Sequence, residues 1–145
     1  MTQVSVRYIV DDVDAAIAFY SERRGFEVQL HPAPGFAVLS RGDLRLLLNS
    51  PGGPGGAAQP MPDGRMPEPG GWNRIQLEVA DLDAEVERLR AAGGVGFRNE
   101  IVGGRGGRQI LIEDPAGNPV ELFEPGRSRS GSCGVAKSPS ISSMR

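Results

Sequence analysis

The residue types able to do chemistry are few in this chain. It has one histidine, His31, and one cysteine, Cys133. A Ser-His-Asp or Cys-His arrangement needs an imidazole beside its nucleophile, and His31 stands alone while Cys133 lies in the Ser- and Gly-rich end of the chain. Proton transfer by a carboxylate is the remaining option. Glu78, with Gln76 as orienting partner, is a candidate base because burial can raise the pKa of a carboxyl toward the working range; the alternative is a solvated strand face.

Arginines in a glycine-rich segment suggest a second kind of chemistry, anion binding. The stretch "GGRGGRQ" (Gly103 to Gln109) carries Arg105 and Arg108. It lacks the strand-to-helix context of a phosphate-binding loop, so it does not predict a nucleotide site. Either arginine could still close over an anionic ligand. Trp72, which follows "PEPGG", suits stacking on a flat ligand or ordinary packing between modules.

These residues lie on elements that the chain repeats. "VRYIVDDVDAAIAFY" (Val6 to Tyr20) and "IQLEVADLDAEVERL" (Ile75 to Leu89) share their pattern of Val, Asp and Ala. Each copy begins as a β-branched strand, continues with an Asp suited to cap a helix (Asp12, Asp81), and then shows apolar residues at helical spacing. A glycine follows each predicted helix, as is common at helix ends.

Three strand-like runs follow each predicted helix: "FEVQLH", "FAVLS" and "LRLLLN" in the first copy, and "FRNEIV", "RQILIE" and "PVELFE" in the second. The pattern is βαβββ, twice. It predicts an α+β fold in which two βαβββ modules form paired, curved, mixed sheets around a cavity. The expected boundaries are a first module at 1–49, a Gly/Pro-rich linker at 50–71, a second module at 72–125 and a flexible tail at 126–145.

Composition limits the partners. The 145 residues are 39% hydrophobic without a long apolar run, so we expect no membrane span. The net charge of −2 comes from interspersed residues, so no basic stripe argues for nucleic acid. A single cysteine and a start without secretory-signal features favour the cytoplasm.

Three stretches resemble the vicinal-oxygen-chelate superfamily, which includes glyoxalase I, extradiol dioxygenases and bleomycin-resistance proteins. They are "YIVDDVDAAIAFYSERRGFEV", "IQLEVADLDAEVERLRAAG" and "EDPAGNPVELFEP". The last, an Asp-Pro-x-Gly-Asn turn with a Glu shortly after it, is the most specific. The resemblance covers about residues 3–125 and implies the fold more strongly than any one reaction.

In metal-dependent members of this superfamily, ligands come from the first strand of each module and from a Glu in the last strand. The resemblance places these positions at Ser5, Arg74 and Glu121. Only Glu121 is a usual ligand, because a hydroxyl binds such metals poorly and a guanidinium cation repels them. We therefore expect no metal or other cofactor, with a divalent metal as the alternative, and an Arg74–Glu121 ion pair in the metal's place.

If these three positions face the cavity, the period-2 alternation of a strand brings other side chains to the same face. The predicted ligand-binding set is then Arg7, Arg74, Gln76, Glu78, Glu121 and Phe123, with Trp72 and Arg108 at its rim. Groups of this kind suit a ligand with several oxygens and a flat apolar body.

The resemblance allows two classes of function. The first is a metal-independent small-molecule binding protein of the bleomycin-resistance type, which sequesters a drug or natural product. The second is an enzyme, either glyoxalase- or dioxygenase-like or a metal-free isomerase or lyase, with Glu121 or Glu78 as the catalytic residue. The resemblance also implies a homodimer whose modules complete each other's cavities.

Overall fold

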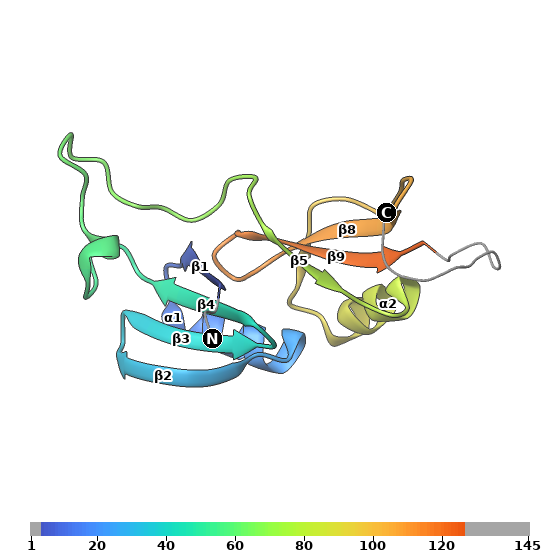
Figure 1. Cartoon of the computed structure of the whole chain (residues 1–145), viewed down its shortest axis with the longest axis horizontal. Helices are drawn as coiled ribbons and strands as arrows, with labels where there is room; N and C mark the ends of the chain where they lie inside the picture. The colour runs from blue at the N-terminus through green and yellow to red at the C-terminus, as the bar shows by residue number, and fades with distance from the viewer. Residues whose placement is uncertain (1–3, 127–145) are drawn as a thin grey trace.

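The computed structural model describes residues 4–126 and contains two βαβββ modules side by side (Figure 1). The expected tail and Cys133 lie outside the described residues, apart from Gly126. The first module consists of β1 (Val4–Ile9), α1 (Val13–Ala18), the π-helical turn η1 (Phe19–Arg23), β2 (Glu27–Ala33), β3 (Phe36–Arg41) and β4 (Leu44–Asn49). Its strand order is β1-β4-β3-β2, with β1 and β4 parallel and the other pairs antiparallel.

The second module repeats this topology. It consists of β5 (Ile75–Glu78), α2 (Leu82–Ala92), β6 (Gly96–Phe97), β7 (Val102–Gly103), β8 (Gly107–Glu113) and β9 (Pro119–Pro125). The order is β5-β9-β8-β6, with β7 also paired to β8 and with β5 and β9 parallel. The predicted α+β class and the repeated βαβββ pattern are thus confirmed.

The two predicted helix caps form as expected. The Asp12 carboxylate accepts a hydrogen bond from the Ala15 backbone N–H, and the Asp81 carboxylate accepts one from Ala84, both at 3.1 Å. These bonds satisfy backbone donors that the first turn of a helix leaves without partners. The two copies of the sequence repeat therefore begin their helices with the same capping hydrogen bond.

Two elements differ from the expectation. The first helix widens into η1 after Ala18, which places two neighbours in sequence, Phe19 and Tyr20, in the core, with ring centroids 4.9 Å apart. The expected strand "FRNEIV" is split into β6 and β7. Its middle leaves the ladder because the Asn99 side chain, in place of a backbone carbonyl, accepts from the Leu111 N–H at 2.9 Å.

Each helix covers one face of its sheet, and we call the opposite face the inner face. Alternation is clear in β5, where Ile75 and Leu77 are buried toward the helix while Gln76 and Glu78 are exposed on the inner face. One cluster of buried apolar residues runs through both modules. The linker, which contains the short 3-10 turn η2 (Gly56–Ala58), makes a wide excursion beside the first module before it returns to β5 (Figure 1).

Buried hydrogen bonds fasten the modules together, and we call this group the clasp. The Tyr8 hydroxyl donates to the Pro119 carbonyl at 2.9 Å and accepts from the Ile75 N–H at 2.8 Å. Tyr20 donates to the Asp114 carboxylate at 2.9 Å. The clasp thus joins β1 and η1 of the first module to β5, β9 and the turn before β9.

Both tyrosines of the chain belong to the clasp, which makes its ionisation measurable. Burial raises the pKa of Tyr8 from 10.0 to about 12 and raises that of Tyr20 further. A raised pKa favours the neutral phenol in the folded state. The contribution of these tyrosines to the free energy of unfolding is therefore fully present below pH 10 and is lost as pH rises through about 12.

In an alkaline titration, we expect the ultraviolet absorbance of tyrosinate to appear only together with unfolding, followed by circular dichroism. The same protein in denaturant is the control and should titrate near pH 10. A tyrosine that titrates near pH 10 in the folded protein would contradict the buried clasp.

Candidate functional site

A hollow on the inner face of the second sheet is the first candidate site, and we call it the Trp72 hollow. Its volume is about 600 Å³, and its lining consists of Gly71, Trp72, Arg98, Asn99, Leu111 and Glu113. Trp72 is 73% exposed, and the Arg98 guanidinium lies 5.2 Å from its ring centroid. An exposed indole beside an apolar floor offers a flat ligand a surface for stacking.

Hydrogen bonds from Arg98 fix the position of the segments around this hollow. Its guanidinium donates to the Glu113 carboxylate at 2.7 Å and to the carbonyls of Gly71 and Gly117 at 2.9 and 3.0 Å. These bonds tie the segment that carries Trp72 to the second sheet. Arg98 is not among the predicted site residues, because "FRNEIV" predicts a regular strand and no sequence signal marks the contacts of its arginine.

Beside the hollow, Arg74 and Glu121 form the ion pair that the sequence analysis expects. The Glu121 Oε1 atom accepts from Arg74 Nε at 3.0 Å and lies 2.9 Å from Arg74 Nη2. The other oxygen, Oε2, accepts from Gln76 Nε2 at 2.7 Å. Glu121 is only 7% exposed, so these partners compensate a charge that would be costly to bury alone.

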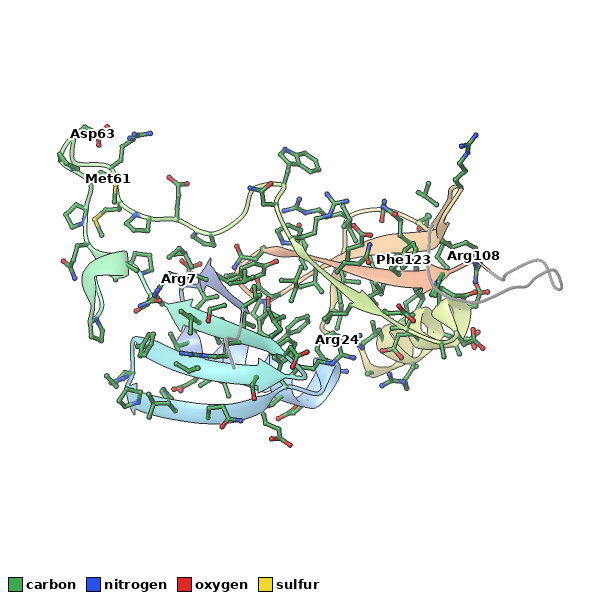
Figure 2. The ribbon with its side chains drawn as sticks, viewed as in Figure 1. Arg7, Arg24, Met61, Asp63, Arg108 and Phe123 are labelled. Carbon is green, nitrogen blue, oxygen red and sulfur yellow. The ribbon has the colours of Figure 1, made fainter. Side chains whose placement is uncertain are left out.

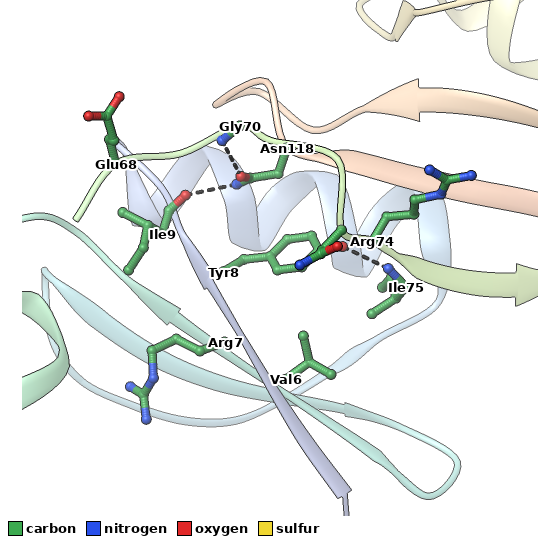
Figure 3. Close-up of a pocket in the computed structure, with 10 residues that line it drawn as sticks. Val6, Arg7, Tyr8, Ile9, Glu68, Gly70, Arg74, Ile75 and Asn118 are labelled. Atoms are coloured by element: carbon green, nitrogen blue, oxygen red, sulfur yellow. Dashed lines mark hydrogen bonds between the residues drawn. The ribbon is translucent and has the colours of Figure 1, made fainter.

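A second pocket lies between the modules, under the end of the linker, with a volume of about 400 Å³ (Figure 3). Arg7 and Arg74 both line it, but their guanidinium groups point in opposite directions. Asn118 closes one side: its amide donates to the Ile9 carbonyl at 2.8 Å, and its Oδ1 accepts from the Gly70 N–H at 2.7 Å. These bonds fix the path of the chain toward Trp72.

The predicted ligand-binding set therefore does not form one cavity within the chain. Arg74, Gln76 and Glu121 meet, but Arg7 donates to the Asn49 side chain at 2.6 Å on the first sheet. Arg7 shares the pocket between the modules with Arg74, but Gln76 and Glu121 do not line that pocket. Strand alternation was enough to place Gln76, but not to bring Arg7 to it.

Two further predicted residues lie elsewhere. Glu78 lines a different cleft, at the opposite end of β5, and is not hydrogen-bonded to Gln76. Arg108 alternates onto the helix side of β8, where it pairs with Asp83 and Glu124 at 2.9 and 3.0 Å (Figure 2). These carboxylates raise the pKa of Arg108. Arg108 therefore does not line the Trp72 hollow.

Phe123 and His31 do not line the Trp72 hollow. Phe123 lies on the inner face of β9, opposite Glu78 and Gln109 in the neighbouring strands. The imidazole of His31 lies 3.7 Å from the exposed Asp14 carboxylate, on the other module. His31 therefore contributes nothing to the Trp72 hollow.

Comparison with protein families gives a direct result. The family model described as "Glyoxalase/Bleomycin resistance protein/Dioxygenase superfamily" matches residues 2–122. The chain belongs to this superfamily. The resemblance seen in the sequence is thereby confirmed, and the superfamily's fold agrees with the two βαβββ modules.

Solved structures of superfamily type share the fold but differ in what they do. A lactoylglutathione lyase from Agrobacterium tumefaciens is 25% identical, with a TM-score of 0.64, and the match covers 85% of this chain and 92% of that one. TnmS3, an antibiotic-binding protein from Streptomyces sp. CB03234, is also 25% identical (TM-score 0.61, coverage 87% and 98%). The bleomycin-binding protein of Streptomyces verticillus, complexed with copper(II)-bleomycin, is 22% identical (TM-score 0.57, coverage 87% and 98%).

A search of the curated proteins finds no match. Within residues 4–126, no helix is both long and apolar enough to cross a membrane. Membership of the superfamily therefore establishes the fold, but it does not establish the chemistry of the site.

The residues at the superfamily's metal-ligand positions do not fit a divalent cation. Glu121 already uses one oxygen for Arg74 and the other for Gln76, and a cation there would meet the positive guanidinium. Ser5 lies on β1, in the other sheet. In the part of the chain that the structure describes, no three His, Cys, Asp or Glu side chains gather as a metal site would require.

The Arg74–Glu121 pair can be tested by stability. We expect Arg74→Gln to lower the free energy of unfolding by about 2 kcal/mol, because it leaves Glu121 buried without its cation while Arg74 itself is partly exposed. Urea denaturation measures the change. Arg65→Gln is the matched control: it breaks an exposed pair with Asp63 and should cost at most ~0.5 kcal/mol. Equal effects of the two variants would contradict the compensating role of Arg74.

Proposed function

We propose that this protein binds a flat, oxygen-bearing aromatic molecule in the Trp72 hollow, without a metal, and acts by sequestering it. The observation that carries the proposal is the pairing of an exposed, positioned indole with an apolar floor at Leu111. Polar groups of Asn99, Arg98 and Glu113 surround this floor and can meet oxygens on the ligand. The antibiotic-binding and bleomycin-binding neighbours support a small-molecule ligand.

The state of the carboxylates favours binding over catalysis. A general base needs a free carboxylate within reach of its substrate. Glu121 is held by Arg74 and Gln76, and Glu78 lines a cleft that shares no residue with the Trp72 hollow. An enzyme, of the lyase kind found in the Agrobacterium neighbour, would need Glu121 to exchange both partners for a substrate or metal.

We also propose that the working form is a homodimer. The inner faces of both sheets carry exposed apolar side chains: Leu30 is 53% exposed on the first sheet and Val102 is 51% exposed on the second. The helices cover only the opposite faces. A second copy that lays its first sheet over the second sheet of this chain would cover these side chains and enclose the Trp72 hollow.

The ligand site can be tested by calorimetry with copper(II)-bleomycin and a panel of polycyclic aromatic natural products. We expect Trp72→Ala to weaken the binding of any hit about tenfold or more, because a stacking aromatic is a typical binding hot spot. Met61→Ala is the matched control, since Met61 is also exposed but lies at the tip of the linker (Figure 2). The Met61→Ala variant should bind the same ligand as tightly as the unaltered protein does.

Two results would contradict this proposal. One is equal loss of affinity in both variants. The other is retention of about one Zn, Ni, Mn or Fe(II) ion per chain after desalting, measured by elemental mass spectrometry. Retention would mean that Glu121 leaves Arg74 for a metal, and would favour the enzyme.

The dimer can be tested by sedimentation velocity. We expect the unaltered protein to sediment as a dimer and Leu30→Glu to sediment as a monomer, because it places a charge on the inner face of β2. Val28→Glu is the matched control, since Val28 is 46% exposed on the same strand but pairs with Leu39 on the helix side. A monomeric unaltered protein, or an unchanged dimer in Leu30→Glu, would contradict this arrangement.

A further inference from the structure

A third cleft lies between the modules at the far end of β5 from the Trp72 hollow. Its volume is about 430 Å³, and its lining consists of Glu22, Arg23, Arg24, Gly25, Arg41, Glu78, Val79, Ala80, Glu85 and Arg88. It shares no residue with the Trp72 hollow or with the pocket under the linker. Four arginines against three glutamates give its lining one net positive charge. We call it the arginine cleft.

Arg24 is a buried cation in the lining of the arginine cleft (Figure 2). Its side chain is only 4% exposed, and it donates through Nη2 to Glu85 on α2. Its Nε atom is buried and has no hydrogen-bond partner within residues 4–126. A buried donor without a partner costs free energy, so Arg24 Nε needs an acceptor that residues 4–126 do not provide.

The other arginines increase the positive charge around Arg24. Glu85 is shared, since Arg88 donates to its second oxygen. Burial lowers the pKa of Arg24, and the nearby cations Arg88 and Arg41 lower it further. The Glu85 carboxylate thus pairs with two guanidinium groups, and a third guanidinium group lies near them.

Arg41 is that third cation, and it comes from the first module. It lies over Gly25, where a Cβ atom would come within 3.9 Å of Arg41 Nε. Across the described part of the chain, Arg41 makes no salt bridge and no side-chain hydrogen bond, although Glu22 and Glu78 line the same cleft. Arg23, by contrast, donates to the Gly93 carbonyl at 3.1 Å.

We infer that the arginine cleft is a binding site for a small oxyanion, either a carboxylate or a phosphate. The anion lies between Arg24 and Arg41 of the first module and Arg88 of the second. Guanidinium groups present paired donors that match the geometry of both anions. The bound anion gives Arg41 a partner and balances the charge that Glu85 alone leaves. Because its contacts come from both modules, it also stabilises their packing.

The test is thermal unfolding with inorganic phosphate at constant ionic strength, with chloride as the replaced salt. A ligand that binds only the folded state raises the melting temperature with its concentration. Phosphate also stabilises proteins generally, by exclusion from their surface, so the comparison of variants decides the result. A parallel titration with acetate shows whether a carboxylate suffices or a phosphate is needed.

Arg41→Gln should weaken the apparent phosphate affinity about tenfold, the loss expected for one charge-assisted contact. Arg45→Gln is the matched control: it removes the same charge from the neighbouring strand β4, outside the cleft, and should respond like the unaltered protein. Glu78→Gln should bind phosphate more tightly, because it removes a like charge from the cleft. Equal responses of the Arg41 and Arg45 variants, or no specific response to either anion, would overturn the inference.

Discussion

The rest of the structure depends on the clasp, because it sets how the two modules lie against each other. The Tyr8 hydroxyl bonds to both the first and the last strand of the second module, and Tyr20 bonds to Asp114 in the turn between β8 and β9. Asp114 in turn accepts from the backbone of its own turn and from Asn118, while burial raises its pKa. The turn "DPAGN", the most specific motif of the sequence, is therefore a structural joint.

This joint also explains how the Trp72 hollow is built. Asn118 belongs to the clasp turn, yet its side chain also holds the Ile9 carbonyl and the Gly70 N–H. The chain that leaves Gly70 reaches Trp72 and Arg74 within a few residues, so the end of the linker is fixed from one side by Asn118 and from the other by Arg98. An indole that is largely exposed would otherwise be expected to move freely; here the backbone that carries it is tied to the second module by Asn118 and Arg98, and Asn118 is tied in turn to Ile9 of the first sheet.

The Arg74–Glu121 ion pair has a simple electrostatic explanation. Glu121 stays where the superfamily resemblance places a ligand, but a guanidinium supplies the positive charge and Gln76 the remaining hydrogen bond. The buried carboxylate is then compensated by Arg74, and each of its oxygens accepts a hydrogen bond. Binding by shape and stacking at the neighbouring hollow becomes the function that this arrangement supports best, while the arginine cleft, at the other end of β5, leaves positive charge for an anion.

Local patterns in the sequence were sufficient for the elements and for contacts between adjacent strands. The repeat, the Asp caps and strand alternation predict both modules, whereas the Arg74–Glu121 pair was expected from the superfamily resemblance, which places both residues at metal-ligand positions. Contacts between distant segments carry no such periodic signal. The placement of Arg7 away from Arg74 depends on how one module packs on the other. The contacts of Arg108 with Asp83 and of Arg98 with Gly71 lie within the second module and the end of the linker, and Arg24 and Arg41 approach each other within the first module. All of these contacts join residues far apart in the chain.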